Sequence, residues 1–289
     1  MPRKDSDQGP AFERAGRTTL RMGLIAINDQ QWVEPFNDEE NRFSRNHKKH
    51  VIRQDPTTIQ ISESAIDATR EWYFELKRHL LRDHPHLANV KTLLQPPLPH
   101  SPARDLLTIL SYSIPDDICI LQHNPRQENS AYCLTAASVQ SPSLWHPREK
   151  IGQPLASIHS PVPDIASRLM PAMERLLRHL KSGRPVARYN WSLQPDQRLN
   201  RQPETEPAIA PETPLFYRCE RQALIRMPAT DAIVFLIRTR VWPLENLTSI
   251  SQGQLTPEQI LRAALQLPLR EQAYKGIQTL QPAFIKYLS

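Results

Sequence analysis

Two runs near the C-terminal end decide the fold: YRCERQALIRM (residues 217–227) and AIVFLIRTRV (residues 232–241), separated by PATD (residues 228–231). The second run is apolar on both faces over most of its length, as a central strand is. The four-residue connection contains a proline and is typical of a turn, so the two runs are predicted to form an antiparallel hairpin.

A second hairpin is predicted from residues 118–122 and 131–140, with the polar loop 123–130 between them. Helical periodicity or capping residues mark further segments, at residues 62–81 (capped by Ser62), 103–112, 164–181 (stopped by Gly183), 257–265 (capped by Thr256) and 269–280. Pro171 is expected to kink or restart the third of these. Antiparallel hairpins with helices set apart from them indicate an α+β fold.

The chain is predicted to form one main domain, residues 21–289, after a polar N-terminal arm, residues 1–20, that we expect to be disordered. Residues 201–214 contain four prolines, which can neither continue a helix nor join a central strand. This segment is therefore predicted to be an exposed Pro/Glu-rich linker or flap.

Composition narrows the class of protein. The 289 residues include 28 prolines but only 7 glycines, so glycine-cradled phosphate sites are not expected. The first twenty residues lack the apolar core of a signal peptide, and no stretch approaches the roughly 18 apolar residues of a membrane span, so we expect a cytoplasmic protein without membrane contact. Cys119, Cys133 and Cys219 form no CxxC motif, which suits reduced thiols.

A net charge of +6 invites a nucleic-acid-binding hypothesis. Basic residues are, however, mixed with acidic ones over most of the chain, and no RNP-like motif, helix-turn-helix pattern or zinc-finger spacing accompanies them. We therefore expect no nucleic-acid partner.

Charged residues gather at one end of the C-terminal hairpin. Because side chains alternate along a strand, Arg238 and Arg240 share a face of one strand. On the other strand Arg218 and Glu220 share a face, and Arg221 lies opposite. Two interpretations remain open: a pocket whose guanidinium groups grip a carboxylate or propionate while Glu220 offers the anionic contact, or a structural Arg/Glu network.

His159 is a candidate metal ligand, because two prolines close behind it in IHSPVP (residues 158–163) restrict the backbone and present the imidazole rigidly. A lone histidine is more often structural, and His146, also before a proline, is the rival. The pairs in HKKH (residues 47–50) and HPH (residues 84–86) support a zinc site only weakly. GxSxG, P-loop and GxGxxG patterns are absent, so redox chemistry would draw its electrons from another protein.

Six segments occur in a characteristic order: MGL (22–24), PDDICIL (115–121), SLWHPREKIGQPLASIHSPVP (143–163), RYNW (188–191), ERQALIRMPATDAIVFLIRT (220–239) and YKG (274–276). With these motifs the chain resembles the DUF3445 family, also called the haem-dependent oxidative N-demethylases, over about residues 20–280. The resemblance implies a PAS-like α+β fold, with an antiparallel sheet and flanking helices, that binds haem b. It also implies oxidative removal of a methyl group from a small secondary methylamine as formaldehyde, with O2 and electrons from a separate flavin and iron–sulfur reductase.

Within this resemblance His159 is our candidate for the proximal iron ligand. Chemistry suggests roles for the other polar residues near the motifs: Glu220 would hold the cationic amine, Trp191 would wall the pocket, and the arginines are candidates for the haem propionates, namely Arg188, Arg218, Arg221, Arg238 and Arg240.

Fold and haem do not fix function. A haem-binding PAS-like sensor or scaffold without turnover is the alternative, and a nucleic-acid- or protein-binding module that uses the basic surface is the third. A Soret band in the purified protein would separate both haem hypotheses from the third.

Overall fold

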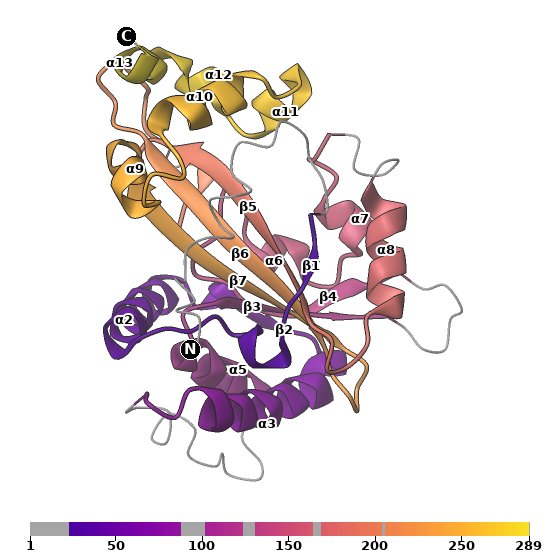
Figure 1. Cartoon of the computed structure of the whole chain (residues 1–289). Helices are drawn as coiled ribbons and strands as arrows, with labels where there is room; N and C mark the ends of the chain where they lie inside the picture. Colours follow the sequence, from indigo (N-terminus) through magenta and orange to yellow (C-terminus); the bar gives the residue numbers. More distant parts are fainter. Residues whose placement is uncertain (1–22, 88–101, 124–130, 164–168, 204–205, 289) are drawn as a thin grey trace.

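Figure 1 shows the computed structural model of the chain, which describes residues 23–87, 102–123, 131–163, 169–203 and 206–288. In these residues the centre is an open seven-stranded sheet, antiparallel throughout, in the order β1-β5-β6-β7-β3-β4-β2. Its strands are β1 (Ile25–Ala26), β2 (Ile59–Ile61), β3 (Asp117–Gln122), β4 (Cys133–Ser138), β5 (Val186–Gln194), β6 (Phe216–Arg226) and β7 (Ile233–Pro243). Helices surround the sheet, which confirms the α+β class.

Both predicted hairpins are confirmed. β6 pairs with β7 along their whole length, from Phe216 opposite Pro243 to Arg226 opposite Ile233. Asp231 ends the turn between them in the left-handed region, with φ of 59°. β3 pairs with β4, and most of their predicted loop lies outside the described residues. β5, which carries the RYNW motif, is a strand that the sequence analysis does not predict.

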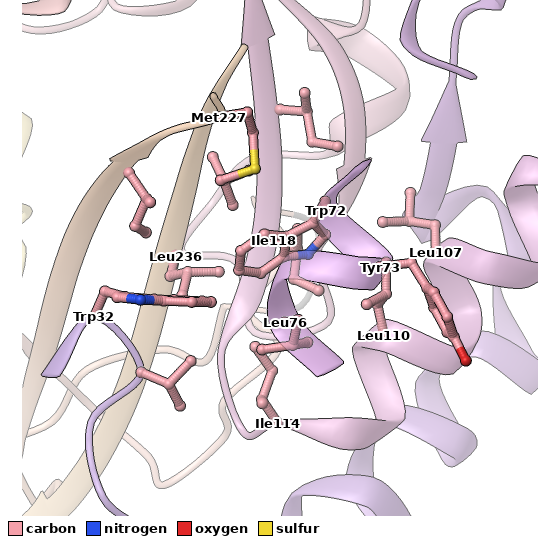
Figure 2. Close-up of a cluster of buried hydrophobic side chains, with 14 of the residues drawn as sticks. Trp32, Trp72, Tyr73, Leu76, Leu107, Leu110, Ile114, Ile118, Met227 and Leu236 are labelled. Atoms are coloured by element: carbon pink, nitrogen blue, oxygen red, sulfur yellow. The ribbon is translucent and has the colours of Figure 1, made fainter. Parts of the chain in front are cut away.

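Different helices cover the two faces of the sheet (Figure 1). We call them the α3 face and the α8 face. The α3 face packs against α2 (Asp38–Gln54), α3 (Ile66–Asp83) and α5 (Ala103–Ser113), and Figure 2 shows Trp72 and Leu107 from these helices in one cluster with Ile118 and Leu236 from the sheet. The α8 face carries α6 (Pro147–Lys150), α7 (Leu155–Ile158) and α8 (Met170–His179).

The C-terminal helices form a third group around one end of the sheet, where they enclose Trp191 and Tyr217. They are α9 (Leu247–Ile250), α10 (Pro257–Leu265), α11 (Leu269–Tyr274), α12 (Ile277–Leu280) and α13 (Ile285–Leu288). Short 3₁₀ turns complete the described chain: η1 (Asp29–Gln31), η2 (Pro56–Thr58), η3 (Glu63–Ala65), η6 (Leu244–Asn246) and η7 (Gln281–Phe284).

The predicted helices are present, with corrections at their ends. α3 begins at Ile66, and the Ser62 hydroxyl donates to the Thr135 carbonyl rather than capping the helix. α8 has Pro171 in its first turn and ends before Gly183, which instead allows a tight turn with φ of +72°. α10 has the predicted Thr256 cap, in a reciprocal capping box with Gln259. The segment 269–280 is two helices rather than one.

The helix α2 is absent from the sequence prediction, because its buried side is mostly polar. Asn41, Ser44, Lys48 and Val51 recur at helical spacing and are buried, whereas the apolar Phe43 is 65% exposed. The Nζ of Lys48 donates to the carbonyls of Ser111, Ile114 and Asp116. A search for apolar periodicity cannot detect such a helix; the cap at Asn37 and the three acidic residues after it are the signals in the sequence.

Other predictions fall partly outside the described residues, including the N-terminal arm, residues 1–20. Within 201–214 the described residues are mostly exposed or half-buried, but Arg201 is buried and forms an ion pair with Glu206.

The three cysteines are unpaired. Among the helices of the described ranges, none has the length and apolar character needed to cross a membrane.

Two histidines are buried as neutral imidazoles at the α3 face. His79 stacks on Trp32 with ring centroids 3.8 Å apart, and both His79 and His84 are 2% exposed. Burial lowers the pKa of His79 to about 3, with a further contribution from His84 and an opposing one from Asp83. Burial likewise lowers the pKa of His84.

We expect the free energy of unfolding to decrease as the pH falls below about 6.5, because the unfolded chain then binds protons that these imidazoles do not accept in the fold. Each histidine contributes a slope of up to about 1.4 kcal/mol per pH unit. For His79 the loss continues down to about pH 3. The measurement is urea unfolding at a series of pH values. The free energy of unfolding should fall less steeply below pH 6.5 in His79→Phe, which keeps an aromatic ring on Trp32. The control His50→Phe, at an exposed position, should behave as wild type does. If the free energy of unfolding falls with acid as steeply in His79→Phe as in wild type, His79 is not a cause of the loss.

Candidate functional site

The central strands leave part of their α8 face incompletely covered by the described chain. The side chains that point to this face from the middle of these strands are half-buried: Val186, Arg188 and Asn190 on β5, Glu220, Gln222 and Leu224 on β6, and Phe235, Ile237 and Thr239 on β7. Most residues that alternate with them on the α3 face are buried, including Ala187, Cys219, Ala223 and Leu236, whereas Tyr189 and Arg240 are half-buried. We call this half-buried set the open surface. A partly uncovered region in the middle of a sheet is where a ligand can pack.

One half of the open surface is apolar. Leu224 and Phe235 from the sheet, together with Ile158 from α7 and Val162 just beyond it, are partly exposed and border one hydrophobic cluster. A flat apolar ligand that packed here would remove their remaining surface from water, which stabilises binding.

The other half of the open surface is polar and is organised around Glu220. Its Oε1 accepts a hydrogen bond from Nε of Arg218 at 2.9 Å, and its Oε2 accepts from Nε2 of Gln222 at 3.1 Å and from Nδ2 of Asn190 at 3.5 Å. Burial by itself raises the pKa of Glu220, but the charge of Arg218 and these hydrogen bonds lower it below its usual value overall. Glu220 is therefore ionised at neutral pH.

Arg188 lies two residues before Asn190 on the same face of β5. Its Nε is buried without a hydrogen-bond partner. Burial lowers the pKa of Arg188, while the carboxylate of Glu220 opposes this effect. A guanidinium donor withdrawn from water without a partner is unfavourable, so an anion bound beside Arg188 would stabilise it.

Lys275 and Tyr274, from the YKG motif, approach the same polar half from α11. Nζ of Lys275 donates to the Trp191 carbonyl at 2.5 Å and to Oδ1 of Asn190 at 3.4 Å. Burial lowers the pKa of Lys275 to about 8, opposed by Glu220. Burial raises the pKa of Tyr274, and the charge of Glu220 adds to this shift.

His159 immediately follows α7, beside the apolar residue Ile158. Its Nδ1 lies 2.9 Å from the Leu155 carbonyl, so Nδ1 carries the proton and Nε2 is left with a free lone pair. Burial lowers the pKa of His159, and the nearby positive charge of Arg188 lowers it further, although the Leu155 hydrogen bond opposes both. A neutral imidazole held through Nδ1–H is the form that binds a metal.

The rival histidine, His146, has both ring nitrogens engaged. Its Nε2 lies 2.9 Å from Oδ2 of Asp55, and its Nδ1 accepts the backbone N–H of Arg148 at 3.1 Å to cap α6. Binding a metal through either nitrogen would break one of these contacts.

Three of the predicted arginines lie outside the polar half of the open surface, because their side chains point to the α3 face. Arg221 donates to the carbonyls of Gln31 and Trp32. Arg238 is 2% exposed and is paired with Asp116 at 2.6 Å and with Glu40 at 3.0 Å. Arg240 is paired with Glu34 and Glu40. The ring of Trp191 also lies away from the open surface, in the cluster with Tyr217.

The structure thus brings together Arg188, Arg218 and Glu220 from the predicted set, and the charge of Arg188 acts on His159 strongly enough to lower its pKa. The sequence reasoning missed Asn190, Tyr274 and Lys275, and it placed Gln222 on the face of Arg218 and Glu220 without assigning it to the site. Apart from Gln222, whose face the strand period gives, membership in the RYNW and YKG motifs was the only signal, because neither motif has a periodicity that indicates what it contacts.

These residues fit the haem that the sequence resemblance implies. A haem iron needs one or two axial ligands from the protein, the macrocycle needs apolar walls, and the propionates need cations. His159, the apolar half and Arg188 meet these needs in turn. Over the described residues no cluster of three or more His, Cys, Asp or Glu side chains is arranged to hold a bare metal ion.

A comparison with known families finds a match along nearly the whole chain. A family model described as "Haem-dependent oxidative N-demethylase, alpha subunit-like" matches residues 23–285. The match includes every residue of the open surface, as well as His159 and Lys275.

Proposed function

Because the chain belongs to the family of haem-dependent oxidative N-demethylases, as an alpha subunit-like member, we propose that it binds haem b at the open surface and demethylates a small secondary methylamine. The observation that carries the proposal is the hydrogen bond from Nδ1–H of His159 to Leu155, which leaves Nε2 available to iron. The neighbouring apolar half of the open surface supports the same placement of the macrocycle.

We assign roles to residues by their place relative to this surface. His159 would hold the haem iron, and Arg188 would bind a propionate, because its Nε has no hydrogen-bond partner within the described chain. Arg218 acts mainly through Glu220, which it holds ionised. For Arg221, Arg238, Arg240 and Trp191 a haem contact stays a prediction that their position on the opposite face does not support.

Bound haem would supply the activation of O2, so that a secondary methylamine R–NH–CH3, one O2, two electrons and two protons yield R–NH2, formaldehyde and water. The apolar half would exclude bulk water from this region. Glu220 is the anion we propose to hold the substrate ammonium, since it is the one carboxylate among the side chains of the open surface and its pKa is lowered.

The family description, alpha subunit-like, implies further subunits. We propose that electrons come from a separate reductase with flavin and iron–sulfur centres. A PAS-like fold is supported by the run of strands β5-β6-β7-β3-β4 and by the insertion of α6, α7 and α8 between β4 and β5.

The functional test is formaldehyde release from a panel of small methylamines by the haem-loaded protein with a competent reductase. Glu220→Gln preserves shape and removes the charge. It should lower kcat/KM by about tenfold to several hundredfold, the roughly 1.4 to 3 kcal/mol of one charged contact, while haem stays bound. Glu212→Gln, in the exposed segment, is the control and should be fully active.

The outcomes separate three roles. Loss of haem together with activity in Glu220→Gln would assign Glu220 to positioning the cations instead of the amine. Full activity would exclude it from amine recognition. Absence of formaldehyde from every amine, in a protein with a Soret band, would favour the non-catalytic haem sensor.

A further inference from the structure

The break between α11 and α12 brings Lys275 to the edge of β5. The helical spacing of residues 269–280 would continue one helix, but Gly276 has φ of +67° and interrupts it directly after Lys275. The Lys275 ammonium then lies over the Trp191 ring, 5.1 Å from its centroid, and within reach of Asn190 on the open surface. The left-handed conformation favours glycine at this position.

Lys275 and Arg188 share an unusual electrostatic state. Both are cations withdrawn from water, yet within the described ranges neither has a carboxylate within ion-pair distance. Glu220, the carboxylate whose charge raises the pKa of both, is bonded to Arg218 instead, which is 1% exposed. Glu271, on α11, adds a weaker attraction to Lys275. Three cations against two carboxylates leave the polar half with excess positive charge.

Their positions are also suited to one ligand. Arg188 and Asn190 are alternate residues of β5, about 7 Å apart on one face, and Lys275 contacts Asn190. Arg188 therefore lies on the open surface, and the Lys275 ammonium lies at the nearby edge of the strand, between the Asn190 side chain and the Trp191 ring.

We propose that Lys275 and Arg188 each bind one of two carboxylates of the same ligand, so that the C-terminal helices supply half of its anion-binding site. The inference rests on the proposed function, in which the two carboxylates are the haem propionates. It adds to the site a residue from the C-terminal helices, a part of the chain that contains neither His159 nor Arg188. It also makes docking of α11 against β5 part of ligand binding, because the ligand neutralises the charge that α11 brings there.

The test compares haem with haem dimethyl ester, in which both propionates are uncharged. Apoprotein is titrated with each and followed at the Soret band, while circular dichroism confirms the fold. Wild type should prefer haem over the ester by at least about tenfold, or about 1.4 kcal/mol. Lys275→Met should lose about tenfold in haem affinity and little in ester affinity. Lys275→Arg should retain the preference, and Lys181→Met, at an exposed lysine, should match wild type.

Each result decides the proposal. Equal losses for haem and ester in Lys275→Met would overturn it, since a packing effect does not depend on the carboxylates, and unchanged haem affinity would overturn it as well. If Lys275→Met fails to fold, the wild-type and Lys275→Arg preferences still decide, because a wild type that binds both ligands equally has no carboxylate site. A wild type that binds haem without this preference refutes the inference alone; one that binds neither ligand refutes the proposed function too.

Discussion

Replacing His159 with alanine is expected to lower haem affinity about a hundredfold or more and to remove the Soret band of the ligated protein. The imidazole is the candidate axial ligand whose Nε2 is free, because its Nδ1 is committed to the Leu155 carbonyl. The measurement is haem titration of the apoprotein, with the Soret position read in the ferric and ferrous forms. Added imidazole should restore part of the original spectrum in the variant by filling the vacated position.

A matched control exists on α8. His179 makes the same local contact, with Nδ1 at 2.7 Å from the carbonyl four residues earlier, but it is exposed. His179→Ala should bind haem as wild type does. If His159→Ala keeps an unaltered spectrum, the assignment is wrong, and His146→Ala or replacement of a cysteine becomes the next experiment.

Replacing Arg238 with leucine is expected to lower the free energy of unfolding by about 3 to 5 kcal/mol while leaving haem affinity unchanged. Arg238 donates to Asp116, whose side chain is fully buried, so its removal leaves an uncompensated carboxylate in the core of the α3 face. The cost lies in that stranded charge more than in the lost attraction. Urea unfolding of the apoprotein measures it.

Two further variants test the cause. Arg240→Leu removes a cation that is 30% exposed and leaves Glu34 and Glu40, whose side chains are 11% and 32% exposed, so it should cost less than stranding the fully buried Asp116. Arg238→Leu combined with Asp116→Leu should recover part of the loss, because it removes both buried charges. If Arg238→Leu alone kept its stability but lost haem affinity, the structural role would be wrong and Arg238 would be a haem-binding residue.

The sequence by itself predicted those helices, strands and turns whose formation depends on residues close together in the chain. The β6–β7 hairpin followed from two strand-like runs and a four-residue turn, and the start of α10 from the Thr256 cap. The two-residue period also placed Arg218 and Glu220 on one face and Arg221 on the other. The motif around His159, with the other motifs, indicated the family, and the match over residues 23–285 confirms it.

Only the tertiary structure decided which charges meet. Both Arg188 and Arg238 are candidates for the same role in the sequence, but Arg238 finds Asp116 and Glu40 from distant segments while Arg188 finds no acidic partner in the described chain. Likewise, α2 buries polar residues because its partners are carbonyls of α5 and the segment after it, and Lys275 reaches β5 because Gly276 ends a helix. Periodicity reports which side of an element is apolar within a few residues. The partner that satisfies a buried charge is fixed by contacts between residues far apart in the chain, which no local pattern encodes.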